Sequence, residues 1–453
     1  MTSYRDFLAN KAQLEGNHGF APDELPDWLY DFQQDLVDWA CRKGRGALFA
    51  DCGMGKTPMQ LAWAEQVVRR SGRPVLIVTP LAVARQTVLE AEKFGIDAAV
   101  SRDGTVASPI TVTNYDRLHL FERTDYDGIV LDESSAIKSF DGERRKIVTA
   151  FARKMPYRLL ATATAAPNDY IELGTSSEAL GYMGHMDMLG RYFTNGQQTS
   201  KAVRNWTGDK WRFKGHAEVP FWRWVSSWAR ALRRPSDLGY DDGLFQLPEL
   251  VIRERIIEAR TPTPDRLFDL PAIGLQEERS ESARTVEERC EAAAEAIQGA
   301  GSAVMWCHIN RESELLTKLV DGAVEIKGSD SPESKEAALA AFATGEIRTL
   351  VTKPSIAGWG LNWQHCHRMT YFPSHSYEQW YQAVRRCWRF GQRNPVEVDV
   401  IATEGTSRVL ASLQRKSLQA DEMFEALTAH MRDAVSIDRN QVYPNDVKVP
   451  AWV

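Results

Sequence analysis

Short apolar runs alternate with longer amphipathic stretches through the first part of the chain. The runs are ALFA (47–50), VLIVTP (75–80), ITVTNY (110–115), GIVLDE (128–133) and YRLLATAT (157–164). The stretches between them, such as PMQLAWAEQVVRR, carry apolar residues at the spacing of a helix. Buried strands that alternate with helices are typical of a parallel sheet flanked by helices. The pattern predicts one α/β lobe over residues 28–175.

A second series of the same kind starts near residue 300. Its runs are SAVMWCHI (302–309), RTLVTK (348–353), HRMTYFP (367–373) and VEVDVIA (396–402). Helical spacing in RESELLTKLV and SPESKEAALAAFATG separates these strands. A second α/β lobe is therefore predicted over residues 261–403. The rest is predicted to be an N-terminal extension (1–27), an insert and linker (176–260), and a brace helix with an irregular tail (404–453).

Composition adds limits to this picture. A length of 453 residues is too great for one ordinary core and fits two domains with an insertion. No apolar run reaches the roughly 20 residues that a membrane span needs, so no membrane partner is expected. Six widely spaced cysteines without a C-x-x-C pair predict reduced thiols. A net charge of −6 still leaves room for a local basic groove.

The segment ALFADCGMGKTPMQLAWAE (47–65) has the order of strand, glycine-bearing turn and helix that a phosphate cradle needs. Gly53 and Gly55 let the backbone approach phosphates, so that successive N–H groups face the anion. Lys56 is expected to reach the β- and γ-phosphates of ATP, and the Thr57 hydroxyl to bind Mg²⁺. The predicted ATP-binding residues of this loop are Gly53, Met54, Gly55, Lys56 and Thr57.

The run GIVLDESS (128–135) places two adjacent carboxylates after an apolar strand. Ligands of open α/β sheets bind at the carboxyl ends of the strands. Asp132 is expected to hold Mg²⁺ through its oxygens. Glu133 is expected to orient and deprotonate the attacking water. An acidic, solvated strand end is the alternative for such a pair, and the upstream phosphate loop favours the catalytic interpretation.

The stretch YEQWYQAVRRCWRFGQ (377–392) contains two arginines within a Q…GQ frame. Arg386 and Arg389 stand three residues apart and share one helix face. The stretch resembles the last motif of superfamily 2 helicases, and most closely that of Swi/Snf-like DNA translocases. The matching positions are Gln382, Ala383, Arg386, Arg389, Gly391 and Gln392. A guanidinium of this face is expected to stabilise charge on the transferred phosphoryl group.

Further stretches match the same family in its order, and the resemblance implies their roles. LYDFQ (29–33) places Gln33 near adenine, and AGWGLNW (357–363) places Gly360 at the nucleotide. The residues expected to couple ATP hydrolysis to movement are Ser135, Thr162, Thr164 and Gln382. The residues expected to contact nucleic-acid phosphates are Thr79, Asn114, Lys353 and Asn362. Phosphate contacts carry no direct sequence information, so little sequence preference is expected.

Three positions depart from the family pattern. Ser135 stands where relatives have a histidine that couples ATP to nucleic acid, and a serine can form hydrogen bonds but carries no charge. Arg385 occupies a position that is acidic in many relatives. Lys353-Pro354 stands where the family often has Arg-Ala. These departures concern the coupling mechanism more than hydrolysis.

A basic, tryptophan-rich stretch, KAVRNWTGDKWRFKGHAEVPFWRWVSSWARALRR (201–234), lies between the predicted lobes. Aromatic side chains interleaved with cations suit single strands or a duplex fork, with Trp206 and Trp211 as candidate contacts. Trp222 and Trp224 belong to the same stretch. Because tryptophan is mostly buried in proteins, packing of the insert against the first lobe is an equally serious alternative.

The resemblance implies two tandem RecA-like lobes with Mg·ATP between them. The implied function is an ATP-driven motor that translocates along DNA, duplex or single-stranded and without sequence preference, and remodels or unwinds it. RNA is a further possible partner. A strand-separating helicase is one alternative, and an ATP-switched nucleic-acid-binding protein with little turnover is another. A monomer in the cytoplasm of a bacterium or a phage-infected cell is expected by resemblance only.

Overall fold

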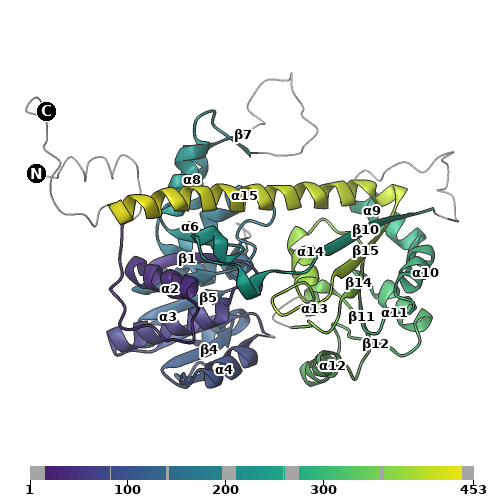
Figure 1. Cartoon of the computed structure of the whole chain (residues 1–453), viewed down its shortest axis with the longest axis horizontal. Helices are drawn as coiled ribbons and strands as arrows, with labels where there is room; N and C mark the ends of the chain where they lie inside the picture. The colour runs from purple at the N-terminus through teal and green to yellow at the C-terminus, as the bar shows by residue number, and fades with distance from the viewer. Residues whose placement is uncertain are drawn as a thin grey trace, which may run out of the picture.

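The computed structural model describes residues 16–81, 83–138, 142–195, 211–258, 260, 275–357 and 362–440. Two parallel sheets lie side by side, and one long helix, α15 (Ser407–Asn440), runs across both of them (Figure 1). The described residues contain no helix that is both long and apolar enough to cross a membrane. The α/β class and the two RecA-like lobes predicted from the sequence are confirmed.

Lobe one is built on a seven-stranded, all-parallel sheet with the order β3-β4-β2-β5-β6-β1-β9. Its strands are β1 (Arg45–Ala50), β2 (Val75–Thr79), β3 (Ala98–Val100), β4 (Ile110–Asn114), β5 (Gly128–Asp132), β6 (Tyr157–Ala161) and β9 (Ala229–Leu232). Its helices are α2 (Asp31–Lys43), α3 (Lys56–Ser71), α4 (Ala84–Lys93), α5 (Glu143–Ala152), α6 (Leu173–Leu180), α7 (His185–Tyr192) and α8 (Glu218–Ser226). Since all strands run the same way, the loops that follow them meet at one edge.

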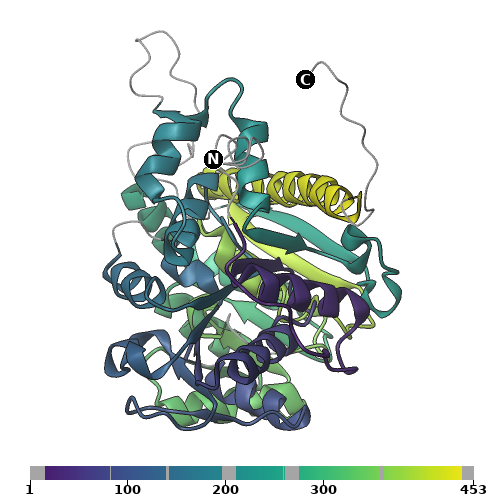
Figure 2. The same cartoon turned by 90° about the vertical axis from the view of Figure 1, so that its left-hand side faces the viewer.

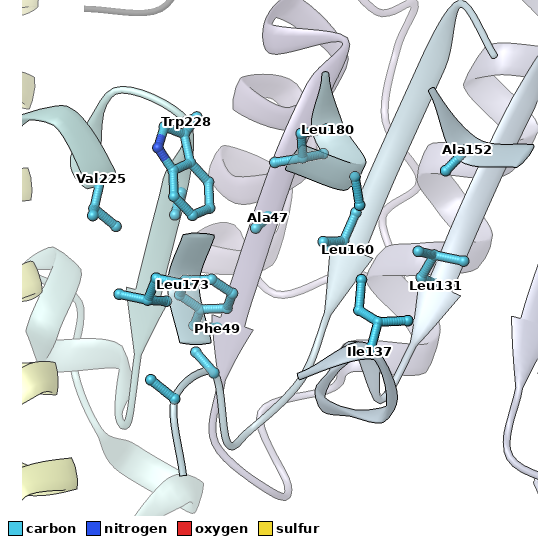
Figure 3. Packing of buried hydrophobic residues seen from close by; sticks show 14 of the residues in the cluster. Ala47, Phe49, Leu131, Ile137, Ala152, Leu160, Leu173, Leu180, Val225 and Trp228 are labelled. Atoms are coloured by element: carbon cyan, nitrogen blue, oxygen red, sulfur yellow. The ribbon is translucent and has the colours of Figure 1, made fainter. Parts of the chain in front are cut away.

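The core of lobe one explains why its strands are apolar on both faces. Phe49 and Leu160, from the sheet, lie beside Leu173 and Trp228 on one side (Figure 3). Helices α2 and α3 cover the other side, where Trp63 is completely buried. A parallel sheet covered on both faces needs continuous apolar runs instead of alternating ones.

The described part of the tryptophan-rich insert, from residue 211 onward, contributes to this core. Trp222 and Trp224 on α8 are buried at 2% and 0% exposure, and Trp228 is buried beside them. The core-packing alternative therefore holds for these residues. A short antiparallel hairpin, β7 (Phe193–Asn195) with β8 (Trp211–Phe213), lies at the same end of the molecule as α15 (Figures 1 and 2). Trp211 on β8 is half-buried against the core.

Lobe two has a six-stranded, all-parallel sheet with the order β10-β15-β14-β11-β13-β12. Its strands are β10 (Leu250–Ile257), β11 (Ala303–Trp306), β12 (Ala323–Glu325), β13 (Thr349–Thr352), β14 (Arg368–Tyr371) and β15 (Val396–Thr403). Its helices are α9 (Leu275–Arg284), α10 (Val286–Ala296), α11 (Asn310–Leu319), α12 (Pro332–Thr344), α13 (Pro354–Ala357) and α14 (Tyr377–Val384). The buried face of α14 packs into the core of this lobe.

Both sheets reach into the span that the sequence predicts to be insert and linker. Strand β9 pairs with β1 from Ala47↔Ala229 to Ala50↔Leu232, so the sheet of lobe one continues to residue 232. Strand β10 pairs with β15 along its whole length, so the sheet of lobe two starts at residue 250. Strand β9 has three apolar residues and one arginine, and β10 has three consecutive charged residues in its middle, so both lack the continuous apolar run by which the other strands are recognised.

Helix α15 leaves lobe two and packs on lobe one. The Ala231 N–H donates to Met431 Sδ at 3.0 Å. Arg233, which follows β9, donates to Asp421 at 2.7 Å, and its guanidinium lies 4.5 Å from the centre of the Phe424 ring. The helix therefore connects the two lobes and contacts loops that follow their strands, since Lys416 Nζ also donates to Asn168 Oδ1 at 3.1 Å and to the His375 carbonyl at 2.5 Å.

One interior ion pair gives a test of how lobe two is stabilised. Arg289 on α10 and Glu312 on α11 are 2.7 Å apart, and each is 3% exposed. Arg289→Met leaves a buried carboxylate without its counter-charge, so we expect a loss of about 3–5 kcal/mol in unfolding free energy. Arg311→Met is the matched control, because Arg311 pairs with Glu287 between the same two helices at 63% and 66% exposure.

The control should change stability by less than about 1 kcal/mol. Thermal unfolding of both variants measures the difference, at roughly 2–4 °C for each kcal/mol. Equal shifts in the two variants would contradict this account of the buried pair.

Candidate functional site

The phosphate loop lies between β1 and α3, and two of its glycines are irreplaceable by geometry. Gly53 and Gly55 have φ angles of 92° and 78°, which side chains rarely tolerate. A Cβ on Gly55 would lie 2.1 Å from Gln33 Nε2. That amide donates to the Met54 carbonyl at 2.9 Å, so the structure places Gln33 directly against the loop. The predicted adenine contact and the loop therefore form one unit.

Lys56 is the first residue of α3, so the positive end of the helix faces the loop. Its Nζ donates to the carbonyl of Ala50 at 3.0 Å. Thr57 follows in the same turn and is half-buried. Both residues thus lie where the sequence predicts them, at the junction of loop and helix.

The two carboxylates end β5 and begin the turn after it. Asp132 Oδ1 accepts a hydrogen bond from Gln60 Nε2 at 2.6 Å. Burial, and then the neighbouring charge of Glu133, raise the pKa of Asp132 to about 7, while Gln60 and Lys56 act in the opposite direction. Carboxylate and hydroxyl oxygens are ligands that Mg²⁺ prefers. This donor chemistry fits Mg²⁺ held by Asp132 and the Thr57 hydroxyl.

Glu133 connects the carboxylates to the segment after β6. It has a φ of 49°, and no other non-glycine residue of the described ranges has a positive φ. Thr162 Oγ1 donates to Glu133 Oε2 at 3.1 Å, and the Thr164 N–H donates to Thr162 Oγ1 at 3.1 Å. Strained backbone that neighbouring groups hold in place is common at functional sites. The predicted coupling residues Thr162 and Thr164 are thus connected by hydrogen bonds to Glu133, the predicted catalytic base.

The other two predicted coupling residues are buried polar groups. Ser135 is 3% exposed and Gln382 is 1% exposed. Among the described residues, the Ser135 hydroxyl and the Gln382 Nε2 have no hydrogen-bond partner, and the same holds for the hydroxyl of Thr164. Buried polar groups are nearly always paired in folded proteins. These three groups are therefore available to form new bonds when the lobes move.

The arginine motif of lobe two lies next to the boundary between the two lobes, which is called the seam below. Arg386 is buried, and its Nη2 donates to Gln382 Oε1 at 2.8 Å. Helix α14 ends at Val384, so the predicted common helix face of Arg386 and Arg389 is wrong, and both residues lie in the turns that follow the helix. Arg389 is influenced by lobe one. Burial and then Arg386 lower the pKa of Arg389 to about 10, whereas Cys52 of the phosphate loop and Glu90 of α4 raise it. Two of the groups that act on the pKa of Arg389, Cys52 and Glu90, thus belong to lobe one.

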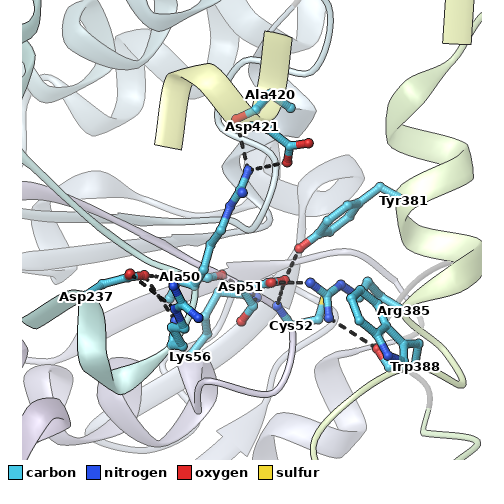
Figure 4. Close-up of polar contacts among 12 residues, drawn as sticks. Ala50, Asp51, Cys52, Lys56, Asp237, Tyr381, Arg385, Trp388, Ala420 and Asp421 are labelled. Atoms are coloured by element: carbon cyan, nitrogen blue, oxygen red, sulfur yellow. Dashed lines mark hydrogen bonds and ion pairs between the residues drawn. The ribbon is translucent and has the colours of Figure 1, made fainter. Parts of the chain in front are cut away.

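Sequence reasoning missed the contact that joins the loop to lobe two. Asp51, the first residue after β1, forms an ion pair with Arg385, and Tyr381 donates to the same carboxylate (Figure 4). Phe390 also touches the loop, since a Cβ on Gly53 would lie 2.9 Å from Phe390 Cβ. The only signal in the sequence is the departure at position 385, which has no meaning until its partner is known.

The residues that are predicted to contact nucleic acid lie in both lobes. The Thr79 hydroxyl is buried and donates to the Pro80 carbonyl at 3.0 Å. Asn114 Oδ1 caps η1 (Tyr115–Leu120) by accepting from two backbone N–H groups. Lys353 Nζ donates to Asn310 Oδ1 at 2.5 Å, and Asn362 is exposed. The side chains of Thr79 and Asn114 thus serve the fold, and the two residues pair with each other at the ends of β2 and β4.

Two predicted site residues, Gly360 and Trp206, lie outside the described residues.

The raised pKa of Asp132 predicts a pH-dependent effect of substitution. A carboxyl group whose pKa is higher in the folded state stabilises the fold at low pH and loses that contribution as pH rises through about 7. Without nucleotide or Mg²⁺, Asp132→Asn should therefore raise the melting temperature more at pH 8 than at pH 5. Asp116→Asn, at an exposed carboxyl group, is the control. An equal change at both pH values would refute a buried, neutral Asp132.

Comparison with known proteins gives partial sequence matches. No protein-family model matches the chain. A stretch of 180 residues, 36% of this chain, is 29% identical to the mouse (Mus musculus) DNA annealing helicase and endonuclease ZRANB3. A stretch of 177 residues, 34% of this chain, is 28% identical to Helicase domino of Drosophila melanogaster. These matches span 17% and 6% of the two relatives.

Most of the chain shares its fold with a solved structure. S. cerevisiae Dbp5 bound to RNA and ADP BeF3 covers 88% of this chain and 93% of its own, with 12% identity and a TM-score of 0.55. The Sulfolobus solfataricus SWI2/SNF2 ATPase core in complex with dsDNA covers 96% and 100%, with 16% identity and a TM-score of 0.42. The chain therefore has a two-lobed, RecA-like fold, and about a third of it is similar in sequence to proteins named as helicases.

Proposed function

We propose that this protein is an ATP-dependent nucleic-acid motor, which hydrolyses ATP to translocate along DNA and to remodel or unwind it. One observation carries the proposal: the arginine motif of lobe two contacts the phosphate loop of lobe one, through the Arg385–Asp51 ion pair and through Phe390 beside Gly53. A site made by two lobes changes when the lobes move, and this links hydrolysis to motion. The names of the two sequence relatives, both helicases, support the same class.

Each residue of the seam has a distinct role in this proposal. Lys56 leaves the Ala50 carbonyl to bind the β- and γ-phosphates. Glu133 orients the attacking water and accepts its proton, and Thr162 holds the carboxylate in position. Arg389 approaches the terminal phosphate from lobe two. Mg²⁺, held by Asp132 and Thr57, would neutralise phosphate charge when bound.

Movement would pass from the site to the nucleic acid through the hydrogen bonds that start at Glu133. Thr162 and Thr164 form these bonds, and the unpaired polar groups of Ser135 and Gln382 lie in the motifs on either side of the seam. The backbone at Thr79 and Asn114, at neighbouring strand ends, would contact phosphates of either strand type. Backbone-to-phosphate contact predicts binding without sequence preference.

We also propose that the protein acts as a monomer in the cytoplasm of a bacterium or a phage-infected cell. All six cysteines are buried and free, which suits a reducing compartment.

The hairpin β7–β8 favours strand separation as a second candidate function. Its Phe193 and Phe213 rings stack at 4.6 Å, and Tyr170 lies against Phe213. A pocket of about 230 Å³ lies at its base, lined by these aromatic residues, Trp211 and Lys416. Aromatic groups beside a cation can stack on a base at a duplex fork. Unwinding of a tailed duplex distinguishes a helicase from a translocase that leaves strands paired.

The first functional test is the turnover of ATP with and without nucleic acid. Wild-type turnover should rise severalfold with duplex DNA, single-stranded DNA or RNA, and the strongest activator identifies the preferred substrate. Lys56→Ala should abolish turnover, because the phosphates lose their main counter-charge. Lys93→Ala, at the exposed end of α4, is the matched control and should behave as the wild type.

Equal rates with and without every nucleic acid would argue against a motor. ATP-dependent binding of nucleic acid with little turnover would instead indicate a switch. Normal turnover in Lys56→Ala would remove the phosphate-loop assignment.

Arg389 gives a second test, which separates chemistry from binding. If Arg389 acts on the transferred phosphoryl group, Arg389→Ala should lower kcat by about 10³-fold or more and leave ATP affinity nearly unchanged. Arg393→Ala is the control, because Arg393 is exposed just beyond the motif. A large loss of affinity with normal kcat would show that Arg389 only binds ATP.

A further inference from the structure

The carboxylate of Asp51 is shared between the phosphate loop and lobe two. Within the loop, Oδ1 accepts the N–H of Cys52 at 2.6 Å. From lobe two, the Tyr381 hydroxyl donates to Oδ1 and Arg385 Nη2 donates to Oδ2 (Figure 4). The Asp51 carbonyl accepts from the Met54 N–H at 3.2 Å. One residue thus fixes the bend of the loop and binds the opposite lobe.

Arg385 is built into lobe two as a rigid group. Its guanidinium carbon lies 4.2 Å from the Trp388 ring centre and 5.3 Å from that of Tyr381. Its Nη1 donates to the Trp388 carbonyl at 3.3 Å. The side chains of Arg385 and Asp51 are 8% and 7% exposed, so water screens their attraction little. An arginine held between two rings can meet the carboxylate in few other orientations.

Arg385 is the neighbour of the arginine segment in the sequence, so its ion pair with Asp51 also affects where that segment lies. Arg385 directly precedes Arg386 and lies four residues before Arg389. Fixing Arg385 to the loop therefore fixes the arginine segment relative to Lys56. Other ion pairs across the seam, Lys138–Glu378 and Arg85–Glu336, involve no loop residue.

We propose that Arg385 and Asp51 form a clasp that positions the arginine segment 386–389 against the phosphate loop. Both are positioning residues, because their charged groups bind each other and neighbouring protein groups. The clasp borders a cavity of about 730 Å³ between the lobes, the linker and α15, which gives Arg385 room to withdraw when the seam opens. The catalytic part of this inference rests on the proposed ATPase function, whereas the clasp itself does not.

Hydrogen exchange tests the clasp without any nucleotide. Arg385→Gln removes the charge, so the Asp51 carboxylate loses its partner and the loop loses its anchor to lobe two. Exchange of the amides of residues 51–56 should rise at least about tenfold, and Arg385→Lys, which keeps the charge, should show a smaller rise. Amides of α10, within lobe two, should be unchanged and report that the variant is folded.

Arg253→Gln is the matched control. Arg253 pairs with Glu397 on the exposed side of lobe two, 2.7 Å apart, so the variant also loses an arginine–carboxylate pair. Its loop amides should exchange as in the wild type. Unchanged loop exchange in Arg385→Gln, with α10 intact, would overturn the clasp.

Steady-state kinetics test the positioning role. A misplaced arginine segment should lower kcat by about 10- to 100-fold in Arg385→Gln with little change in KM, and Arg385→Lys should recover part of the loss. Faster loop exchange with normal kcat would overturn the positioning role. If the wild type hydrolyses no ATP, the proposed function fails, and the exchange experiment still decides the clasp.

Discussion

Buried charge at the seam needs counter-charge from the opposite lobe, and the candidate site depends on this constraint. Asp51 is buried in lobe one, but its ionic partner belongs to lobe two. Asp132 has a raised pKa because it is buried next to another carboxylate, and Arg389 has a lowered pKa because it is buried next to another arginine. Asp51 thus gains a counter-charge from lobe two, whereas the charged forms of Asp132 and Arg389 are each destabilised within their own lobe. A Mg²⁺-bound triphosphate has charges of both signs that suit this arrangement.

The parts of the site that depend on local sequence could be predicted. Strands of a parallel sheet that is covered on both faces need continuous apolar runs, and those runs locate β1, β2, β5 and β6. Each functional loop follows such a strand, so the order of strand, glycine turn and helix places Lys56 correctly at the start of α3. Local order fixes these positions because neighbours along the chain stay neighbours in space.

The parts that depend on distant pairing could not be predicted. Strand β9 has four residues and gains its place only by pairing with β1. The tryptophans of α8 look like a nucleic-acid surface in sequence, yet the burial of large apolar area outweighs any such use for Trp222 and Trp224. Asp51 and Arg385 are separated by more than three hundred residues, and neither residue type marks an ion pair by itself. Motif resemblance identifies where the lobes meet, but not which side chains hold them together.

The most direct measurement is an experimental structure of the protein with Mg²⁺, a non-hydrolysable ATP analogue and DNA. The account predicts that the terminal phosphate lies in the seam, with Lys56 Nζ moved from the Ala50 carbonyl to the phosphates and the Arg389 guanidinium within hydrogen-bond distance of the same group. A nucleotide bound by lobe one alone, with both Arg386 and Arg389 directed away from it, would contradict the account.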